Sequence, residues 1–137
     1  MLARPIWDLL SRGGKHWRPI FGILLLQALG VEPAPYETML AVIPELGHNA
    51  AVVIDDIEDA SQTRRGEETI HLRYGLPTAI NAANTLYFLP LLSISDHPHL
   101  TAGQRDAIYR LIIEMFVQAH FGQAQDLYWS KLEPDRR

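Results

Sequence analysis

Apolar residues recur at the three- and four-residue spacing of amphipathic helices along most of the chain, and this pattern predicts an all-α protein. No segment shows the strict alternation of a strand, and no turn sequence indicates a hairpin. Glycine and proline interrupt the pattern, so we expect the helices to begin and end near these residues. Their approximate ranges are 5–12, 19–30, 36–59, 69–74, 77–92 and 101–129.

Several of these segments carry further information. Pro44 lies inside the third segment and is expected to kink or restart that helix. Thr101 and Gln104 form a capping box before the last segment, which reaches about 28 residues or roughly 40 Å and indicates a large bundle. The apolar runs 20–29 and 86–94 are shorter than the roughly 20 residues of a membrane span. We therefore expect core helices and no membrane span.

The composition is that of an ordinary soluble globular protein. The chain has 137 residues, 47% hydrophobic and 20% charged, which suffices for a single domain over 1–137. The net charge of −4 offers no electrostatic argument for nucleic acid as a partner. The absence of cysteine excludes disulfides and thiolate metal sites, and it agrees with a cytoplasmic location.

The acidic run 55–59 is the first candidate for chemistry. Asp55 and Asp59 share a face of the expected helix, with Asp56 beside them, and they follow five apolar residues that are expected to be core. Carboxylates without sulfur ligands favour Mg²⁺, which completes its coordination with water and phosphate. The alternative is a solvated helix end.

His48 lies two helical turns before Asp55 on about the same face, where a core histidine is the plainer interpretation.

Two basic groups surround the acidic run. Arg64 and Arg65 follow it and offer guanidinium groups that bind phosphate bidentately. The segment 13–19 contains two glycines, Lys15 and Arg18 ahead of an expected helix N-terminus, which favours anions. Exposed charged loops are the alternative for each group alone. Together, two basic groups and one acidic group imply two phosphorylated substrates, of which one is bridged by metal.

At these residues the sequence resembles the trans-isoprenyl diphosphate synthases, also called polyprenyl synthetases. The stretch 54–88 is most similar to geranylgeranyl diphosphate synthases of the eukaryotic type. The resemblance covers nearly the whole chain and implies the N-terminal portion of a helical bundle of the isoprenoid synthase type. The matching pieces are Gly14-Lys15-His16-Trp17-Arg18-Pro19, Glu45-Leu46-Gly47-His48, Asp55-Asp56-Ile57-Glu58-Asp59, Arg64-Arg65-Gly66 and Gly122-Gln123-Ala124-Gln125-Asp126.

The resemblance also implies roles for individual residues. Arg64 would bind the allylic diphosphate, and Gln123 and Asp126 would line the pocket from the long helix. The diphosphate of isopentenyl diphosphate would be held by four basic residues, namely Lys15, Arg18, His48 and Arg65.

The metal site implied by the resemblance contains Mg²⁺ ligated by Asp55 and Asp59, with Asp56 in support. Mg²⁺ and Arg64 would stabilise the departing diphosphate while the allylic C–O bond ionises. The isopentenyl double bond would then attack the cation, and a proton would be lost to the released diphosphate. Positioning and exclusion of water would complete the protein's contribution.

The length of the product is expected to depend on Ala50 and Ala51, one turn before Asp55, because small residues there leave the tunnel open. We therefore expect a product of C20 or longer, with Tyr87 and Phe88 as a possible floor further down or simply as core aromatics. The resemblance implies a homodimer.

The family's second Asp-rich motif and the Lys-Thr pair before it do not occur in the 137 residues. We therefore expect the chain to correspond to the first half of the catalytic fold. Three other functions stay open: a non-catalytic or truncated partner subunit of a full-length prenyl synthase, a terpene cyclase, and an acidic helical bundle without a site. A cyclase needs no isopentenyl site, which the basic residues speak against.

Overall fold

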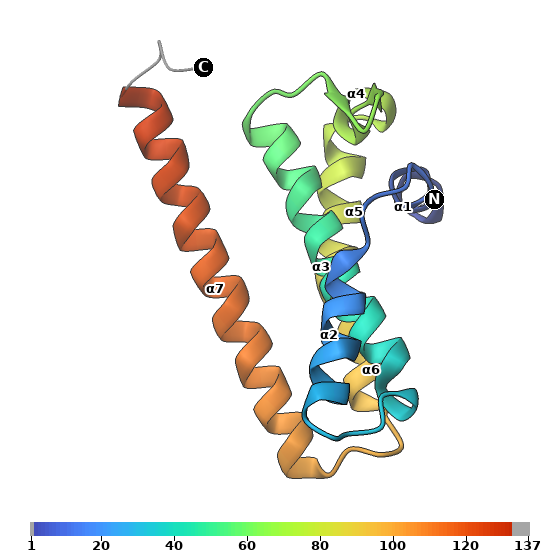
Figure 1. Ribbon diagram of the computed structural model, residues 1–137. Coiled ribbons are helices and arrows are strands. Elements are labelled where there is room, and N and C mark those ends of the chain that lie inside the picture. Colours follow the sequence, from blue (N-terminus) through green and yellow to red (C-terminus); the bar gives the residue numbers. More distant parts are fainter. Residues whose placement is uncertain (1, 133–137) are drawn as a thin grey trace. The chain divides into compact units, whose positions relative to one another are not determined.

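The computed structural model describes residues 2–132, and its regular secondary structure is helical apart from one short hairpin (Figure 1). The expectation of an all-α protein is confirmed. Residues 1–99 and residues 100–137 form two units, and the single domain expected over 1–137 stays a prediction. The elements of the chain are α1 (Ala3–Ser11), α2 (Trp17–Ala28), η1 (Ala34–Tyr36), α3 (Glu37–Glu58), β1 (Thr63–Arg64), β2 (Glu67–Glu68), α4 (Ile70–Tyr74), α5 (Leu76–Phe88), η2 (Leu89–Leu91), α6 (Leu92–Ser95) and α7 (Ala102–Leu132).

The core of the first unit lies around the central helix α3, which packs against α2 and α5 (Figure 1). Alanines on α5 allow the two helix backbones to approach closely, since a methyl group occupies little space between them. The acidic end of α3 therefore follows a helical segment that packs against both neighbours. The main buried cluster consists of Leu9, Val53, Ile70, Ala79 and Ala83.

Pro44 lies inside α3, which continues as one helix from Glu37 to Glu58. Of the two expected outcomes, the restart of the helix at this residue is wrong, and the kink stays a prediction. A proline removes one backbone hydrogen bond from a helix, and the packing of α3 on both neighbours compensates for that loss. His48 and the acidic run consequently sit on one continuous helix.

Residues 63–68 form an antiparallel hairpin in which Thr63 faces Glu68, so the expectation of no hairpin is wrong. The two turn residues, Arg65 and Gly66, both have positive φ, +54° and +79°. Positive φ at both positions is the geometry of a type I′ turn. The sequence signal was weak because each strand has two residues and arginine stands where asparagine or aspartate is usual.

The apolar run 20–29 is not a core helix in this structure, contrary to expectation. It lies in α2, which begins at Trp17 rather than at Pro19 and has no buried residue. Ile20 and Leu24 are each about half exposed. Periodicity alone could not show this, because α2 is apolar around most of its circumference and only one side meets α3.

The run 86–94 does reach the core through Leu86, Pro90 and Ile94, which are buried. It does not form the single helix that was expected. A 3₁₀ turn separates α5 from α6, and helix continues to Ser95 where a loop was expected. Pro90 lies in that turn and lacks the N–H that a continuous helix would use.

The second unit contains α7, a helix of 31 residues, or about 46 Å. The predicted capping box is present: the amide of Thr101 donates to Gln104 Oε1 at 2.9 Å, and the amide of Gln104 donates to Thr101 Oγ1 at 3.3 Å. Within the part of the chain that the structure describes, no helix is both long and apolar enough to cross a membrane.

Candidate functional site

A basic pocket lies at the start of α2, and its volume is about 360 Å³. It contains together the four basic residues that the sequence singled out for one diphosphate, although they are up to 50 positions apart. Lys15 comes from the loop after α1 and Arg18 from the first turn of α2, while His48 lies in the middle of α3 and Arg65 in the hairpin turn. The pocket is lined by Gly14, Lys15, His16, Trp17, Arg18, Glu45, His48 and Arg65.

The loop between α1 and α2 forms one wall of the pocket. Gly13 and His16 both have positive φ, +77° and +43°, and these turns bring the loop back toward the hairpin. A Cβ added at Gly14 would lie 3.6 Å from the Arg65 guanidinium carbon, so the backbone of the loop rests against this arginine. Arg18 stacks over the Trp17 ring, with its guanidinium carbon 4.9 Å from the ring centre.

Arg65 forms the opposite wall and is held by neutral oxygens. Its Nη2 donates to Asn49 Oδ1 at 3.0 Å, and its Nη1 donates to the Leu9 carbonyl at 3.3 Å. Asn49 is 1% exposed, and its amide nitrogen donates to the Glu45 carbonyl at 2.7 Å. These contacts orient the guanidinium without cancelling its charge, so it stays available to an anion. Sequence analysis missed Asn49, and its only signal was an amide among apolar neighbours.

His48 lies among cations in this pocket. Burial lowers the pKa of His48 most, the positive charges of Arg18, Arg65 and Arg64 lower it further, and Glu45 opposes them. Glu45 accepts a hydrogen bond from His16 Nδ1 at 3.1 Å. The free pocket therefore favours the neutral imidazole.

The acidic end of α3 has a different arrangement, in which Arg64 pairs with two aspartates. Its Nε and Nη2 donate to Asp56 Oδ1 at 2.8 and 2.6 Å, and Nη2 also donates to Asp55 Oδ2 at 3.2 Å. Asp56 is 1% exposed. The hydrogen bond to Asp56 is the largest cause that raises the pKa of Arg64. Asp56 thus holds the arginine in place and does not face solvent.

Asp55 and Asp59 are the carboxylates that a metal could use. The side chain of Asp55 is 40% exposed, and Asp59 is exposed at the end of α3. Two hard oxygen donors on one helix face fit Mg²⁺, which commonly takes one or two carboxylates. Among residues 2–132, no group of three or more histidines and acids is arranged to hold a metal ion.

Comparisons with known proteins show the family of the chain. The sequence profile of the polyprenyl synthetases matches residues 1–136. The chain belongs to the polyprenyl synthetase family. It is 37% identical to a geranylgeranyl pyrophosphate synthase of Hericium erinaceus over 93% of its length. It is also 39% identical to one of Metarhizium anisopliae over 94% of its length.

Solved structures of the polyprenyl synthetase family have the same fold. The geranylgeranyl pyrophosphate synthetase of the archaeon Geoglobus acetivorans matches 94% of the chain with a TM-score of 0.81 and 32% identity. A second geranylgeranyl pyrophosphate synthase matches with a TM-score of 0.85 at 22% identity, which shows the fold alone. The chain spans 43% and 37% of the two fungal relatives and 42% of the archaeal structure.

The remaining residues singled out by the family resemblance lie elsewhere. Ala50 is buried, whereas Ala51 is exposed. Gln123 and Asp126 lie three residues apart on α7 in the second unit, Gln123 half-buried and Asp126 exposed. Their functional roles, like those of the other site residues, stay predictions.

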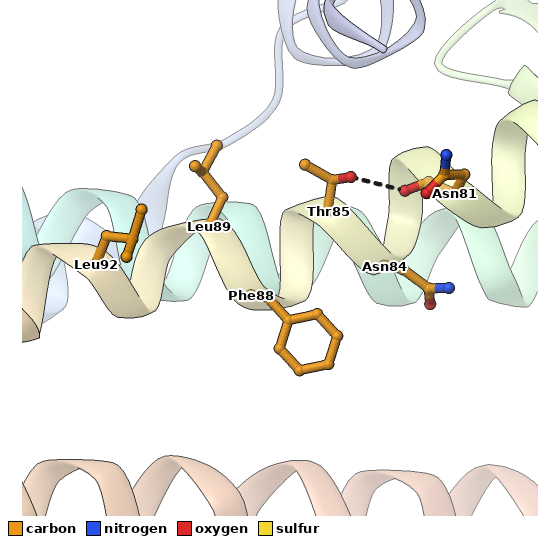
Figure 2. A pocket seen from close by; sticks show the side chains of 6 residues that line it. All are labelled: Asn81, Asn84, Thr85, Phe88, Leu89 and Leu92. Atoms are coloured by element: carbon orange, nitrogen blue, oxygen red, sulfur yellow. Dashed lines mark hydrogen bonds between the residues drawn. The ribbon is translucent and has the colours of Figure 1, made fainter.

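A shallow groove of about 440 Å³ runs along α5 and α6. Figure 2 shows Phe88 and Asn84 pointing to one side of this helical stretch and Leu89 and Leu92 to another. Phe88 is 69% exposed, while Tyr87 is half-buried. Their part in a tunnel floor stays a prediction. The groove is lined by Asn81, Asn84, Thr85, Phe88, Leu89 and Leu92.

Proposed function

We propose that this polyprenyl synthetase chain binds the two substrates of a trans-prenyltransferase and takes part in condensing isopentenyl diphosphate with an allylic diphosphate. The observation that carries the proposal is the basic pocket, in which Lys15, Arg18, His48 and Arg65 meet. A cluster of three permanent cations beside a neutral imidazole is complementary to a diphosphate. The names of the fungal and archaeal relatives support the same reaction class.

The basic pocket would hold isopentenyl diphosphate without a metal. Lys15 is exposed, and within the described residues it forms no ion pair. Arg18 is engaged by the face of Trp17, and Arg65 by two neutral oxygens. None of these contacts neutralises the cation, so the diphosphate would provide the compensating charge.

The acidic end of α3 would hold the allylic diphosphate, with Asp55 and Asp59 binding Mg²⁺. When bound, the metal supplies Lewis-acid stabilisation of the leaving diphosphate. Arg64 would add a hydrogen bond to the same group, and Asp56 orients it. The allylic C–O bond breaks, the isopentenyl double bond forms the new C–C bond, and the proton lost from the adduct passes to the released diphosphate.

Binding of inorganic diphosphate tests the basic pocket directly. Calorimetric titration without metal should show a binding heat for the wild-type chain. Arg65→Met should lower the affinity about tenfold or more, because a hydrogen bond to a charged group contributes about 1.5–3 kcal/mol. The control is Arg110→Met, which removes an exposed arginine whose ion pair, within residues 2–132, is with Asp106. The same loss in both variants would indicate non-specific charge attraction and refute the site.

Turnover is tested with labelled isopentenyl diphosphate, farnesyl diphosphate and Mg²⁺. Label in a prenyl product of C20 or longer supports the full proposal. Diphosphate binding without product would favour the alternative of a partner subunit, which predicts that the chain alters product length when mixed with a complete synthase.

The exposed, small Ala51 supports the proposal that products reach C20 or longer. Ala51→Phe should shorten the product of an active form, whereas Ala50→Phe would overpack the buried core and destabilise the chain. An unchanged product distribution in Ala51→Phe would exclude this residue from the tunnel.

We also propose a homodimer, which sedimentation equilibrium would test through the measured mass.

A further inference from the structure

The C-terminal end of α1 is bonded to the hairpin that presents Arg65 to the basic pocket. Nη1 of Arg12 donates to the backbone oxygens of Glu68 at 2.8 Å and Arg64 at 3.3 Å. These two residues belong to different strands of the hairpin. The side chain of Arg12 is only 4% exposed. One buried guanidinium therefore ties both strands to the residue that follows α1.

Asp8 fixes the orientation of this guanidinium from within α1. Its Oδ1 accepts from Arg12 Nε at 2.9 Å, and its Oδ2 accepts from Tyr74 Oη at 2.6 Å and Arg73 Nη1 at 3.0 Å. Burial raises the pKa of Asp8, but the hydrogen bonds from Arg12, Tyr74 and Arg73 together hold it well below its usual range. The helix α1 lies against α4 and α5 (Figure 1), so Asp8 is a charged anchor on a fixed element.

We propose that Arg12 is a positioning residue for the basic pocket, an inference that rests on the proposed function of that pocket. Arg12 does not line the pocket and would act through Arg65. Arg65 needs a positive φ of +54°, a conformation that persists only where surrounding contacts hold it. Arg12 provides such contacts to both strands, while the Leu9 carbonyl of the same helix accepts from the Arg65 side chain.

The sequence spacing explains why one helix end serves both walls of the pocket. Arg12 is followed directly by the loop that contains Gly14 and Lys15. The hairpin contacts of Arg12 therefore set the separation between that loop and Arg65, and a diphosphate must bridge the two. Loosening this tie would leave all four basic residues present but no longer convergent.

Arg12→Lys separates positioning from charge. Lysine keeps the positive charge but lacks the planar fork that reaches a carboxylate and two carbonyls together. We expect the affinity for inorganic diphosphate, measured calorimetrically without metal, to fall about tenfold. Amide hydrogen exchange in residues 63–68 should accelerate about tenfold or more, while the amides of α3 and α5 stay protected.

Two further variants make the experiment decisive. Arg110→Lys makes the same exchange at an exposed pair with Asp106 and should change neither the affinity nor the hairpin exchange. Asp8→Asn keeps the shape of the anchor and one oxygen acceptor, and we expect a smaller loss of both quantities. If Arg12→Lys unfolds the chain, Asp8→Asn decides the question by the same two measurements.

Each outcome has one meaning. Retained diphosphate affinity in Arg12→Lys overturns the positioning role, whatever the exchange shows. Lower affinity with unchanged hairpin exchange also overturns it, because the effect would then act by another route. If the wild-type chain binds no inorganic diphosphate, the proposed function of the pocket fails, and the hairpin exchange alone decides whether Arg12 holds Arg65 in place.

Discussion

The basic pocket and the acidic end of α3 are neighbours along the hairpin, yet the arginine of each site has partners of opposite kind. Arg65 in the pocket is held by the neutral oxygens of Asn49 and Leu9. Arg64, the preceding residue, is held by the carboxylates of Asp56 and Asp55. The two arginines lie next to each other in sequence, and their partners leave one charge uncompensated and neutralise the other.

This difference indicates two modes of anion binding. The pocket is organised for an anion before any ligand arrives, so the ligand meets cations already oriented. At the acidic end, an incoming diphosphate must share Arg64 with Asp56 and would need a divalent metal to offset the carboxylates of Asp55 and Asp59. Changes to either site test this contrast.

Asp56→Ala should destabilise the chain by about 2–4 kcal/mol, because it leaves Arg64 without the buried partner that fixes it. Urea denaturation of the purified chain measures the change in the free energy of unfolding. The matched variant is Asp59→Ala at an exposed position, where we expect a change within about 0.5 kcal/mol. Equal small effects in both variants would contradict the structural role assigned to Asp56.

Lys15→Met should weaken the binding of inorganic diphosphate about tenfold, or about 1.4 kcal/mol, with little effect on unfolding. The side chain is exposed in the pocket, so its charge serves a ligand and not the fold. Titration calorimetry and urea denaturation on the same sample separate the two effects. A large loss of stability with unchanged binding would reverse the contrast.

Gly66→Ala should destabilise the hairpin by about 1 kcal/mol, because the φ of +79° is unfavourable for a residue with a Cβ. The added methyl group would meet no atom within 4 Å, so the effect reports backbone strain alone. Gly103→Ala is the matched control, since Gly103 lies in α7, also has open space and does not have a positive φ. There the same change should be neutral or stabilising.

The affinity for diphosphate should rise about three- to tenfold as the pH falls through the ordinary His48 pKa of 6.5 and below, because the anion favours the charged imidazole. The stability of the free chain should change in the opposite direction, falling as the pH falls. Its His48 pKa is lowered, so the unfolded chain binds more protons in that window, and the free energy of unfolding falls as the pH falls.

His48→Gln should flatten both pH profiles, measured by calorimetry and by denaturation from pH 5 to pH 8, an interval of about the width over which histidine titrates. A binding profile that stays as steep in His48→Gln would assign the proton uptake to another group of the pocket.

Much of the fold could be predicted from the sequence because helical signals are local. The capping box of Thr101 and Gln104 formed as expected, since its partners are three residues apart. Local signals gave wrong predictions where tertiary packing, and not the neighbouring residues, controls the structure. Pro44 did not end α3, and the run 20–29 formed a helix whose apolar side chains stay largely exposed.

The residue types of the site could also be predicted, whereas their supports could not. Lys15, Arg18, His48 and Arg65 were all singled out from the chain, and the structure brings them together. Asp8 and Arg12 were missed, although their spacing of four residues on a helix is a signal for an ion pair. Nothing local indicates that Arg12 also reaches carbonyls more than fifty residues away.

The sequence by itself determined which segments are helical and which charged groups occur, because backbone propensity and charge belong to the residues themselves. Only the tertiary structure decided which of two adjacent arginines is neutralised. That outcome depends on the turn at Arg65 and Gly66, which sends the Arg64 side chain toward Asp56 and the Arg65 side chain toward Asn49. The direction of a side chain follows from φ and ψ and from packing across the fold, and local sequence patterns reveal neither the backbone angles nor the packing.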